Sequence, residues 1–221
     1  MCAMKITTDA CIQGAWTPVS AGITRVLDIG AGTGILSLML AQRNPDIVID
    51  AVEFDHDAAM QAVENVKASG WKERINVLQG DIRNYIAPAR YDLIISNPPF
   101  FNNSLLSDKA NKNLARHTLS LSYSDLLQAI DNNLNQGGYA SIMLPYTEYL
   151  EWKEGLDENK WYESHKLFIR HKEGAVIKRV VTLFGKKWNP EIKEDTLIIK
   201  GNENLYTPEF TDLLSPFYLN L

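Results

Sequence analysis

Residues 25–41 read RVLDIGAGTGILSLMLA, and this stretch decides the fold class. The run at 25–29 is short and apolar, glycines follow at positions 30, 32 and 34, and residues 35–41 are again mostly apolar. A short apolar run bounded by turn residues predicts a buried strand, and a longer one after a glycine turn predicts a helix. The stretch therefore predicts a strand, a glycine turn and a buried helix in succession.

The same alternation continues along the chain. Short apolar runs predict strands at 47–52, 75–78, 91–96 and 139–144, and helices are expected between Asp55 and Gly70 and over 124–134. Residues 167–170 and 179–184 have no helix-length segment between them, so we expect an antiparallel hairpin, about 162–188, on the sheet edge. Strand–helix alternation predicts a Rossmann-like α/β fold with a mostly parallel seven-stranded sheet, helices on both faces and a C-terminal antiparallel hairpin.

Length and composition are those of one globular domain spanning residues 1–221. Of the 221 residues, 45% are hydrophobic and 22% charged, with no repeat or low-complexity tract. No apolar run approaches the roughly 20 residues of a membrane helix, and the start lacks a signal peptide. Cys2 and Cys11 form neither a metal-ligand cluster nor a disulfide framework. We expect a cytoplasmic protein without a metal site or membrane contact.

Charge is distributed unevenly. The net charge of −5 argues against a protein coated in positive charge for indiscriminate nucleic-acid binding. Residues 164–188, however, contain seven Lys or Arg residues and two histidines, with Glu173 as the single acid. This segment is either a solvated face of the hairpin or a phosphate-binding patch, and the sequence leaves both readings open.

The glycine turn indicates a nucleotide-like cofactor. Glycines let the backbone pass close to a ligand, and the next helix offers unpaired amides to a carboxylate or phosphate. Nicotinamide-binding loops usually read G-x-G-x-x-G, whereas residues 28–34 read D-x-G-x-G-x-G, with the third glycine one residue early. This spacing resembles the loop of class I methyltransferases, so we favour S-adenosylmethionine over a nicotinamide.

Acidic residues recur at the ends of the next strands. Glu53 could accept hydrogen bonds from a ribose diol, and Asp81 could accept one from an adenine amino group with Ile82 beside the ring. The alternatives are a surface carboxylate for Glu53 and a turn residue or helix cap for Asp81. The expected cofactor residues are Asp28, Gly30, Ala31, Gly32, Gly34, Glu53, Phe54, Asp81 and Ile82.

The motif Asn97-Pro98-Pro99-Phe100 follows the strand at 91–96 and is the expected catalytic site. A conjugated exocyclic amine is a poor nucleophile because its lone pair is delocalised. Carbonyl acceptors from Asn97 and Pro98 would hold its two N–H groups and direct the lone pair at a sulfonium methyl. Phe100 offers a face on which a flipped-out base can stack. A rigid turn with an exposed aromatic ring is the alternative.

With these motifs, the chain resembles the bacterial N6-adenine methyltransferases that modify valine tRNA at nucleotide 37. The resemblance covers most of the chain and rests on residues 5–9, 14–16, 28–34, 97–101 and 115–119. It implies a class I methyltransferase fold in which residues 1–22 pack on the cofactor site, where Lys5, Thr8 and Asp9 border the methyl-donor pocket. Such proteins usually carry a further aromatic and basic stretch before the position of Cys2, where this sequence begins abruptly.

The resemblance also implies an RNA-binding surface. The tRNA anticodon loop would be the partner, and the enzyme would be a monomer. The residues expected to contact the RNA are Phe101, Arg116, His117, Lys166, Arg170, Lys178 and Arg179.

Other functions remain open. Some guanine-N2 methyltransferases of ribosomal RNA also use Asn-Pro-Pro-Phe. Glutamine methylation of release factors more often uses Asn-Pro-Pro-Tyr and an extra N-terminal domain, and DNA methylation would need a target-recognition insertion. A non-catalytic RNA-binding factor with a decayed methyltransferase fold is the alternative from another class, and cofactor binding without turnover would identify it.

Overall fold

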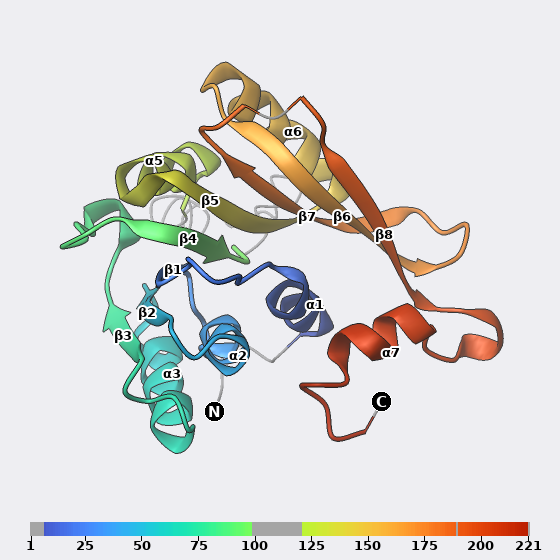
Figure 1. Ribbon diagram of the computed structural model, residues 1–221, viewed down its shortest axis with the longest axis horizontal. Coiled ribbons are helices and arrows are strands. Elements are labelled where there is room, and N and C mark those ends of the chain that lie inside the picture. The colour runs from blue at the N-terminus through green and yellow to red at the C-terminus, as the bar shows by residue number, and fades with distance from the viewer. Residues whose placement is uncertain (1–6, 99–120, 189, 221) are drawn as a thin grey trace, which may run out of the picture.

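The computed structural model describes residues 7–98, 121–188 and 190–220, and its centre is a single mixed sheet (Figure 1). In the described residues the sheet has eight strands in the order β3-β2-β1-β4-β5-β7-β6-β8. The strands are β1 (Arg25–Ile29), β2 (Val48–Glu53), β3 (Ile75–Gln79), β4 (Tyr91–Ser96), β5 (Leu134–Pro145), β6 (Tyr162–Lys172), β7 (Ile177–Gly185) and β8 (Lys193–Lys200).

The predicted parallel half of the sheet is confirmed. β1 pairs in parallel with β2 and β4, β2 with β3, and β4 with β5. β5 is longer than predicted, because its pairing with β4 begins at Leu134 and passes through an irregularity beside Gly138. The Rossmann-like architecture expected from the glycine turn is therefore present.

The C-terminal hairpin is also confirmed, but its predicted place on the sheet edge is wrong. β7 pairs antiparallel with both β5 and β6. β8 then pairs in parallel with β6 and becomes the outer strand, so the sheet has one strand more than the predicted seven. The charged start of β8, Lys193 to Asp195, hid this strand from a reading based on apolar runs.

Helices cover both faces of the sheet, as predicted. They are α1 (Thr8–Trp16), α2 (Ile35–Arg43), α3 (His56–Ala68), α5 (Tyr123–Asn133), α6 (Tyr146–Glu158) and α7 (Pro208–Leu214), with short turns η1 (Ile82–Asn84) and η2 (Asn202–Asn204). Side chains alternate along the strands. Leu27 and Ile94 pack with the core around α5 and α6, whereas Val26, Leu93 and Ile95 pack with the core around α2. No helix in the described residues is long and apolar enough to cross a membrane.

Candidate active site

The predicted cofactor and catalytic positions meet at one edge of the sheet. Ile29 pairs with both Val52 and Ser96, and Val52 pairs with Leu78, so β1 to β4 end side by side. β5 runs in the same direction, and we call the edge where β1 to β5 end the carboxyl edge. Adjacent strands lie about 4.8 Å apart, so the residues after β1, β2 and β4 are close neighbours. The strand order reverses between β1 and β4, which is where ligands bind in open α/β sheets.

The glycine turn has the backbone conformation that its composition indicates. Gly30, Gly32 and Gly34 have φ angles of 70°, 56° and 79°, in the left-handed region where other residues are strained. The amide of Gly30 donates to Val52 O at 2.8 Å, which ties the turn to β2. Among residues 7–98, 121–188 and 190–220, no atom would lie within 4 Å of a Cβ atom at Gly30, so the turn borders space that these residues do not fill. A ligand can therefore approach this backbone closely.

Glu53 connects the glycine turn to the turn after β2. Its Oε2 accepts a hydrogen bond from the Gly32 amide at 2.7 Å, and its Oε1 accepts one from the Asp55 amide at 2.8 Å. The side chain is buried, so the alternative of a surface carboxylate is wrong. Each carboxylate oxygen can accept a further hydrogen bond, so these contacts leave acceptor capacity for a ribose.

Asp28 lies beneath the glycine turn and is fully buried. Its Oδ2 accepts hydrogen bonds from the Ser37 hydroxyl at 2.7 Å and from the Ser37 amide at 3.2 Å, in the first turn of α2. Its Oδ1 has no hydrogen-bond partner among the described residues. Burial raises the pKa of Asp28 to about 7. The hydrogen bonds from Ser37 lower this pKa, and the nearby negative charge of Glu53 raises it slightly. These contacts connect Asp28 of β1 with the first turn of α2.

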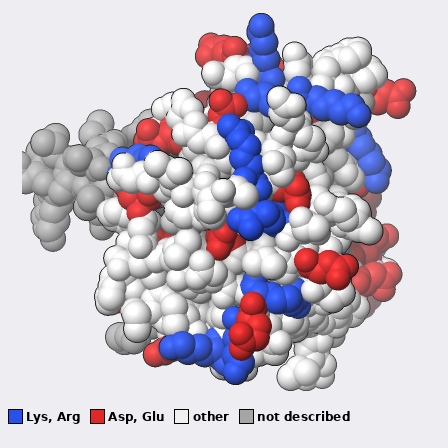
Figure 2. Space-filling view, turned by 60° about the vertical axis from the view of Figure 1, so that its left-hand side comes forward, with Lys and Arg blue, Asp and Glu red and all other residues white. Residues whose placement is uncertain are grey.

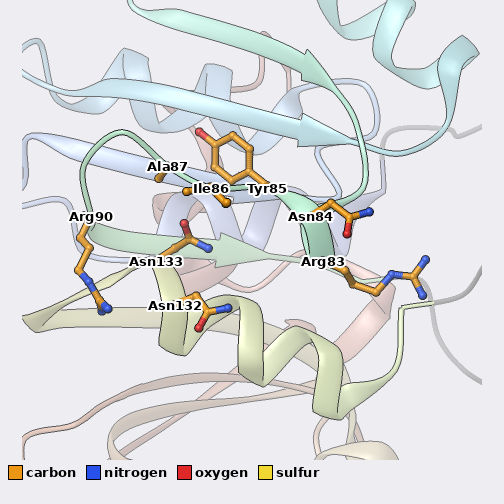
Figure 3. A pocket seen from close by; sticks show the side chains of 8 residues that line it. All are labelled: Arg83, Asn84, Tyr85, Ile86, Ala87, Arg90, Asn132 and Asn133. Carbon is orange, nitrogen blue, oxygen red and sulfur yellow. The ribbon is translucent and has the colours of Figure 1, made fainter.

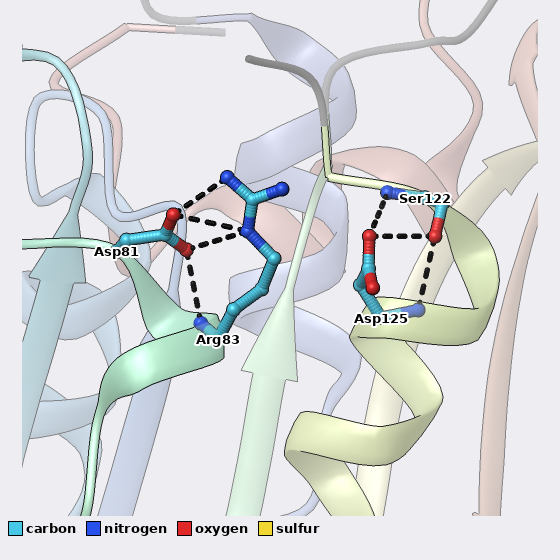
Figure 4. Close-up of polar contacts among 4 residues, drawn as sticks. All are labelled: Asp81, Arg83, Ser122 and Asp125. Atoms are coloured by element: carbon cyan, nitrogen blue, oxygen red, sulfur yellow. Dashed lines mark hydrogen bonds and ion pairs between the residues drawn. The ribbon is translucent and has the colours of Figure 1, made fainter. Parts of the chain in front are cut away.

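Asp81 forms an ion pair with Arg83 and also caps the short turn η1 (Figure 4). Its Oδ2 lies 2.6 Å from Arg83 Nη2, and its Oδ1 accepts from the Nε and the amide of Arg83, each at 3.0 Å. Hydrogen bonds from Arg83 hold the pKa of Asp81 below its usual value. The cap is thus present, and Arg83 also orients the carboxylate expected to meet an adenine amino group.

Two hydrophobic residues of the predicted cofactor set differ in exposure. Ile82 is buried in the core that includes Leu126 and Ile130 of α5. Phe54, directly after β2, is 48% exposed. Phe54 therefore has free surface for a ligand ring, whereas the side chain of Ile82 is mostly occupied by packing.

The catalytic motif begins where β4 ends. Ser96 is fully buried, its hydroxyl donates to Ile29 O at 2.7 Å, and Asn97 and Pro98 follow it directly. The rest of the predicted motif lies outside the described residues, as do three predicted RNA contacts and one cofactor position: Pro99, Phe100, Phe101, Arg116, His117 and Lys5.

The chain is described again just before α5, where a capping box fixes the helix start (Figure 4). The Ser122 hydroxyl accepts from the Asp125 amide at 3.1 Å, and Asp125 Oδ2 accepts from the Ser122 amide at 3.1 Å. α5 leads back to the start of β5, so its first turn lies toward the carboxyl edge. Figure 4 shows this capping box beside the Asp81–Arg83 pair.

A cavity of about 590 Å³ lies beyond Arg83 (Figure 3). Two of its lining residues come from α5 and the others from residues 83–90. Arg90 is engaged with the end of α5, because its Nη1 donates to Asp131 O at 3.0 Å and to Leu134 O at 2.7 Å. This cavity contains none of the residues predicted for catalysis or cofactor binding, and Arg90 contributes to structure there.

The predicted RNA-binding role of Lys166 does not fit the structure. Lys166 is 7% exposed, and its Nζ lies 2.7 Å from Glu194 Oε1 and 3.9 Å from Glu163 Oε2. Glu194 belongs to β8, which the sequence did not reveal, and β8 also brings Asp195 to 2.7 Å from His165. Acids from a neighbouring strand thus neutralise part of the basic segment. On the face in Figure 2, positive and negative side chains also lie beside one another.

The other three RNA contacts predicted in the hairpin, Arg170, Lys178 and Arg179, lie near its turn. Arg179 pairs with Pro145 at the end of β5, so this end of the hairpin lies at the carboxyl edge. Lys178 is exposed, and Arg170 donates to the carbonyl of Ala175 across the turn. Arg179 Nε lies 3.0 Å from Asp9 Oδ2. This ion pair joins a residue predicted to contact RNA, Arg179, to one predicted to border the methyl-donor pocket, Asp9. Thr8 lies beside Asp9 in the first turn of α1.

Sequence reasoning missed several residues that arrange this edge. Ser37 holds Asp28, Arg83 holds Asp81, and Gln13 of α1 contacts the end of β4 and an interior residue of β5. A signal existed for Gln13, a polar residue at a position that proves to be fully buried within a mostly apolar helix. Ser37 and Arg83 carry no such signal, because serine and arginine are common on exposed helix turns.

The chain also matches a family of known proteins. The family described as "Methyltransferase small domain" matches residues 18–135. The tRNA1(Val) (adenine(37)-N6)-methyltransferase of Tolumonas auensis is 43% identical over 221 residues, covering 100% of this chain and 92% of that relative. The protein of the same name from Dyadobacter fermentans is 41% identical, covering 99% of this chain and 92% of that relative.

A solved structure supports the same fold. The crystal structure of a predicted O-methyltransferase, protein Atu636 from Agrobacterium tumefaciens, matches with a TM-score of 0.72. The match covers 94% of this chain and 96% of that one at 18% sequence identity. At this identity the likeness shows a shared fold and carries no statement about the substrate.

Proposed function

We propose that this chain, which belongs to the family of tRNA1(Val) (adenine(37)-N6)-methyltransferases, transfers a methyl group from S-adenosylmethionine to N6 of adenine 37 in valine tRNA. The observation that carries the proposal is Asn97-Pro98 at the end of β4, adjacent to the glycine turn after β1. The chain is then one methyltransferase domain of the class I fold, acting as a monomer, with residues 1–22 packed on the cofactor site.

The glycine turn and its neighbours would bind the cofactor. Bound S-adenosylmethionine supplies a methyl group on a positively charged sulfur. The first turn of α2 offers amides to the cofactor carboxylate, Glu53 retains lone pairs for the ribose, and Asp81 can accept from the adenine amino group. Open space above Gly30 fits a ligand of this kind. Thr8 and Asp9 would border the same pocket, with Lys5 from outside the described residues.

Asn97 and Pro98 would activate the substrate amine. The Asn97 side-chain carbonyl and the Pro98 backbone carbonyl accept hydrogen bonds from the two N–H groups of the substrate amine. The lone pair of the amine nitrogen is then directed at the methyl group. Pro98 and Pro99 stiffen the corner because proline fixes φ, and Phe100 stacks on the flipped-out adenine. Positioning then accounts for most of the rate, as expected for a displacement between two oriented reactants.

The RNA would lie along the carboxyl edge. Arg170, Lys178 and Arg179 at the hairpin turn supply positive charge there, and Phe101, Arg116 and His117 would add contacts from the segment after the catalytic corner. Lys166 is left out of this surface because it is buried and paired with acids. The anticodon loop would then reach the corner through its phosphates, with the flipped base supplying specificity.

The decisive experiment compares the unaltered chain with Asn97→Ala. Both are incubated with methyl-labelled S-adenosylmethionine and unmodified valine tRNA, and the methylated nucleoside is identified by mass spectrometry. We expect N6-methyladenosine from the unaltered chain and a loss of about 100-fold or more in rate for Asn97→Ala, with cofactor affinity retained.

Two controls make this result specific. Asn132→Ala removes an exposed asparagine at the far end of α5 and should leave the rate unchanged. A valine tRNA with guanine at position 37 should not be methylated. Methylation of guanine N2 in ribosomal RNA would refute the substrate, and cofactor binding without turnover on any RNA would favour a binding factor.

A further inference from the structure

We propose that Gln13 is a positioning residue that sets the direction of the peptide bond leading into Asn97. The inference deepens the proposed function and rests on it, since it concerns the corner where Asn97 acts. Gln13 lies in α1, far from Asn97 in sequence, and is fully buried. Its role would be to act through Ser96 and Asn97 without touching the reacting atoms.

The contacts of Gln13 join the end of β4 to the neighbouring strand β5. Its Nε2 donates to Ser96 O at 3.0 Å and to Ser141 O at 3.0 Å, which links the end of β4 to β5. Ser96 O belongs to the planar peptide group that contains the nitrogen of Asn97. A hydrogen bond that fixes the direction of this carbonyl therefore also fixes where the Asn97 backbone begins.

Ser96 is held from a second side as well. Its hydroxyl donates to Ile29 O at 2.7 Å, so the residue before Asn97 is tied to β1 by its side chain and to α1 by its backbone. The glycine turn begins directly after Ile29. This arrangement couples the catalytic corner to the cofactor turn, and a shift of about 1 Å between such parts can cost 100-fold in rate.

α1 is itself well fixed, so Gln13 can serve as an anchor. Arg43 of α2 donates from Nη1 to Gly14 O at 2.7 Å and to Thr17 O at 2.6 Å. A Cβ atom at Gly14 would come within 2.8 Å of Met39 Sδ, so the two helices are in close contact there. Movement of the Gln13 backbone would require both of these contacts to change.

The buried amide of Gln13 is satisfied on its nitrogen side only. Gln13 Oε1 is buried and has no hydrogen-bond partner among the described residues. An apolar side chain of the same size would remove this unsatisfied acceptor, but it would also leave Ser96 O and Ser141 O without their hydrogen bond from residue 13. What such a side chain lacks is the donor that reaches Ser96 and Ser141.

Thr17 provides a matched control for the test. It is also fully buried, and its hydroxyl shares a 2.7 Å hydrogen bond with the hydroxyl of Ser141. Thr17→Val thus removes a hydrogen bond to Ser141 in β5, as Gln13→Met does. Unlike Gln13→Met, it removes no hydrogen bond to Ser96 in β4. Gln13→Met removes the donor to both strands while keeping the side-chain volume.

The first measurement is single-turnover methylation of valine tRNA by the unaltered chain, Gln13→Met and Thr17→Val. We expect Gln13→Met to lower the rate by roughly tenfold or more, with cofactor affinity within about twofold. Thr17→Val should stay within about twofold of the unaltered rate. Equal rate losses in the two variants, or none in Gln13→Met, would overturn the inference.

Gln13→Glu adds a pH readout. An ionised carboxylate cannot donate to Ser96 O, whereas its protonated form regains one O–H donor. We expect the rate of Gln13→Glu relative to that of the unaltered chain to rise as the pH falls from about 8.5 to about 6, because burial raises a carboxyl pKa. A ratio independent of pH, with Gln13→Met equal to Thr17→Val, would leave only a packing role.

Hydrogen exchange separates this inference from the proposed function. If the unaltered chain methylates no RNA, the proposed function fails, but exchange of the backbone amides at residues 94–97 still tests Gln13. Faster exchange there in Gln13→Met, and not in Thr17→Val, supports the positioning role. Identical exchange in both variants refutes it.

Discussion

At the scale of single residues, Asp28 is fully buried, one of its oxygens has no hydrogen-bond partner in the described part of the chain, and its pKa is raised to about 7 from 3.8. The native state therefore binds a proton more tightly than the unfolded chain. This contribution to stability is complete below about pH 4 and is lost as the pH rises to about 7, by up to about 4 kcal/mol. We predict that Asp28→Asn, which cannot ionise, gains stability relative to the unaltered chain across this range.

The measurement is urea unfolding of both proteins without cofactor at several pH values between 4.5 and 8. The exposed Asp46→Asn, which makes the same change at the surface, should follow the unaltered chain. A constant difference between Asp28→Asn and the unaltered chain over this range would show that Asp28 ionises normally.

The positions of the site residues could be predicted from sequence, but their partners could not. Asp28, Glu53, Asp81 and Asn97 follow apolar runs, and parallel strands bring such positions to one edge. Whether a carboxylate faces a ligand, an amide or an arginine depends on side-chain directions across several elements. Spacing along the chain does not encode these directions, so the ion pair of Asp81 with Arg83 was not predicted.

At the scale of elements, Gly138 allows β4 and β5 to pair. A Cβ atom there would lie 2.8 Å from Asp92 O and 3.1 Å from Tyr91 O, which are backbone atoms of β4 and cannot easily move aside. We predict that Gly138→Ala destabilises the protein by about 1–3 kcal/mol, as overpacking does in other cores. Urea unfolding measures the change in the free energy of unfolding.

Gly137→Ala is the matched control, because a Cβ atom at Gly137 would have no described atom within 4 Å. It should change stability by less than about 1 kcal/mol. Equal destabilisation by both substitutions would mean that the contact with β4 does not cause the loss of stability. Chain entropy or strand propensity would then be the cause.

The elements that were missed have a common physical cause. β8 starts with Lys193, Glu194 and Asp195, so its apolar content is confined to a short stretch near its end. Its pairing with β6 depends on residues about 30 positions apart, and local pattern does not report such pairing. Missing β8 also removed the acids that partner Lys166 and His165, so the basic segment looked more positive than it is.

At the scale of the whole molecule, the proposed RNA surface predicts a difference between the two ends of the sheet. Lys178 is exposed near the carboxyl edge, and Lys67 is exposed in the last turn of α3, toward the opposite edge. We predict that Lys178→Ala weakens tRNA binding and reduces the slope of log affinity against log salt concentration by about 1. Lys67→Ala, with the same change of charge, should have no effect.

Titrations of labelled valine tRNA at several salt concentrations measure both quantities. Lys166→Met extends the test, because a buried and paired lysine should contribute nothing to the salt slope. Equal slopes for Lys178→Ala and Lys67→Ala would mean that the RNA does not approach the hairpin turn.

The outer strand β8 has a consequence for how the chain is synthesised and folded. The chain is synthesised from its amino end, so β6 and its Lys166 emerge from the ribosome before Glu194 exists. Until β8 is added, β6 presents one unpaired backbone edge, a surface that promotes association with other chains. A message cut short before codon 193 would release a product with this edge exposed and its buried lysine short of a counter-charge. Such a product offers the cell's chaperones and proteases a means to distinguish truncated chains from finished ones.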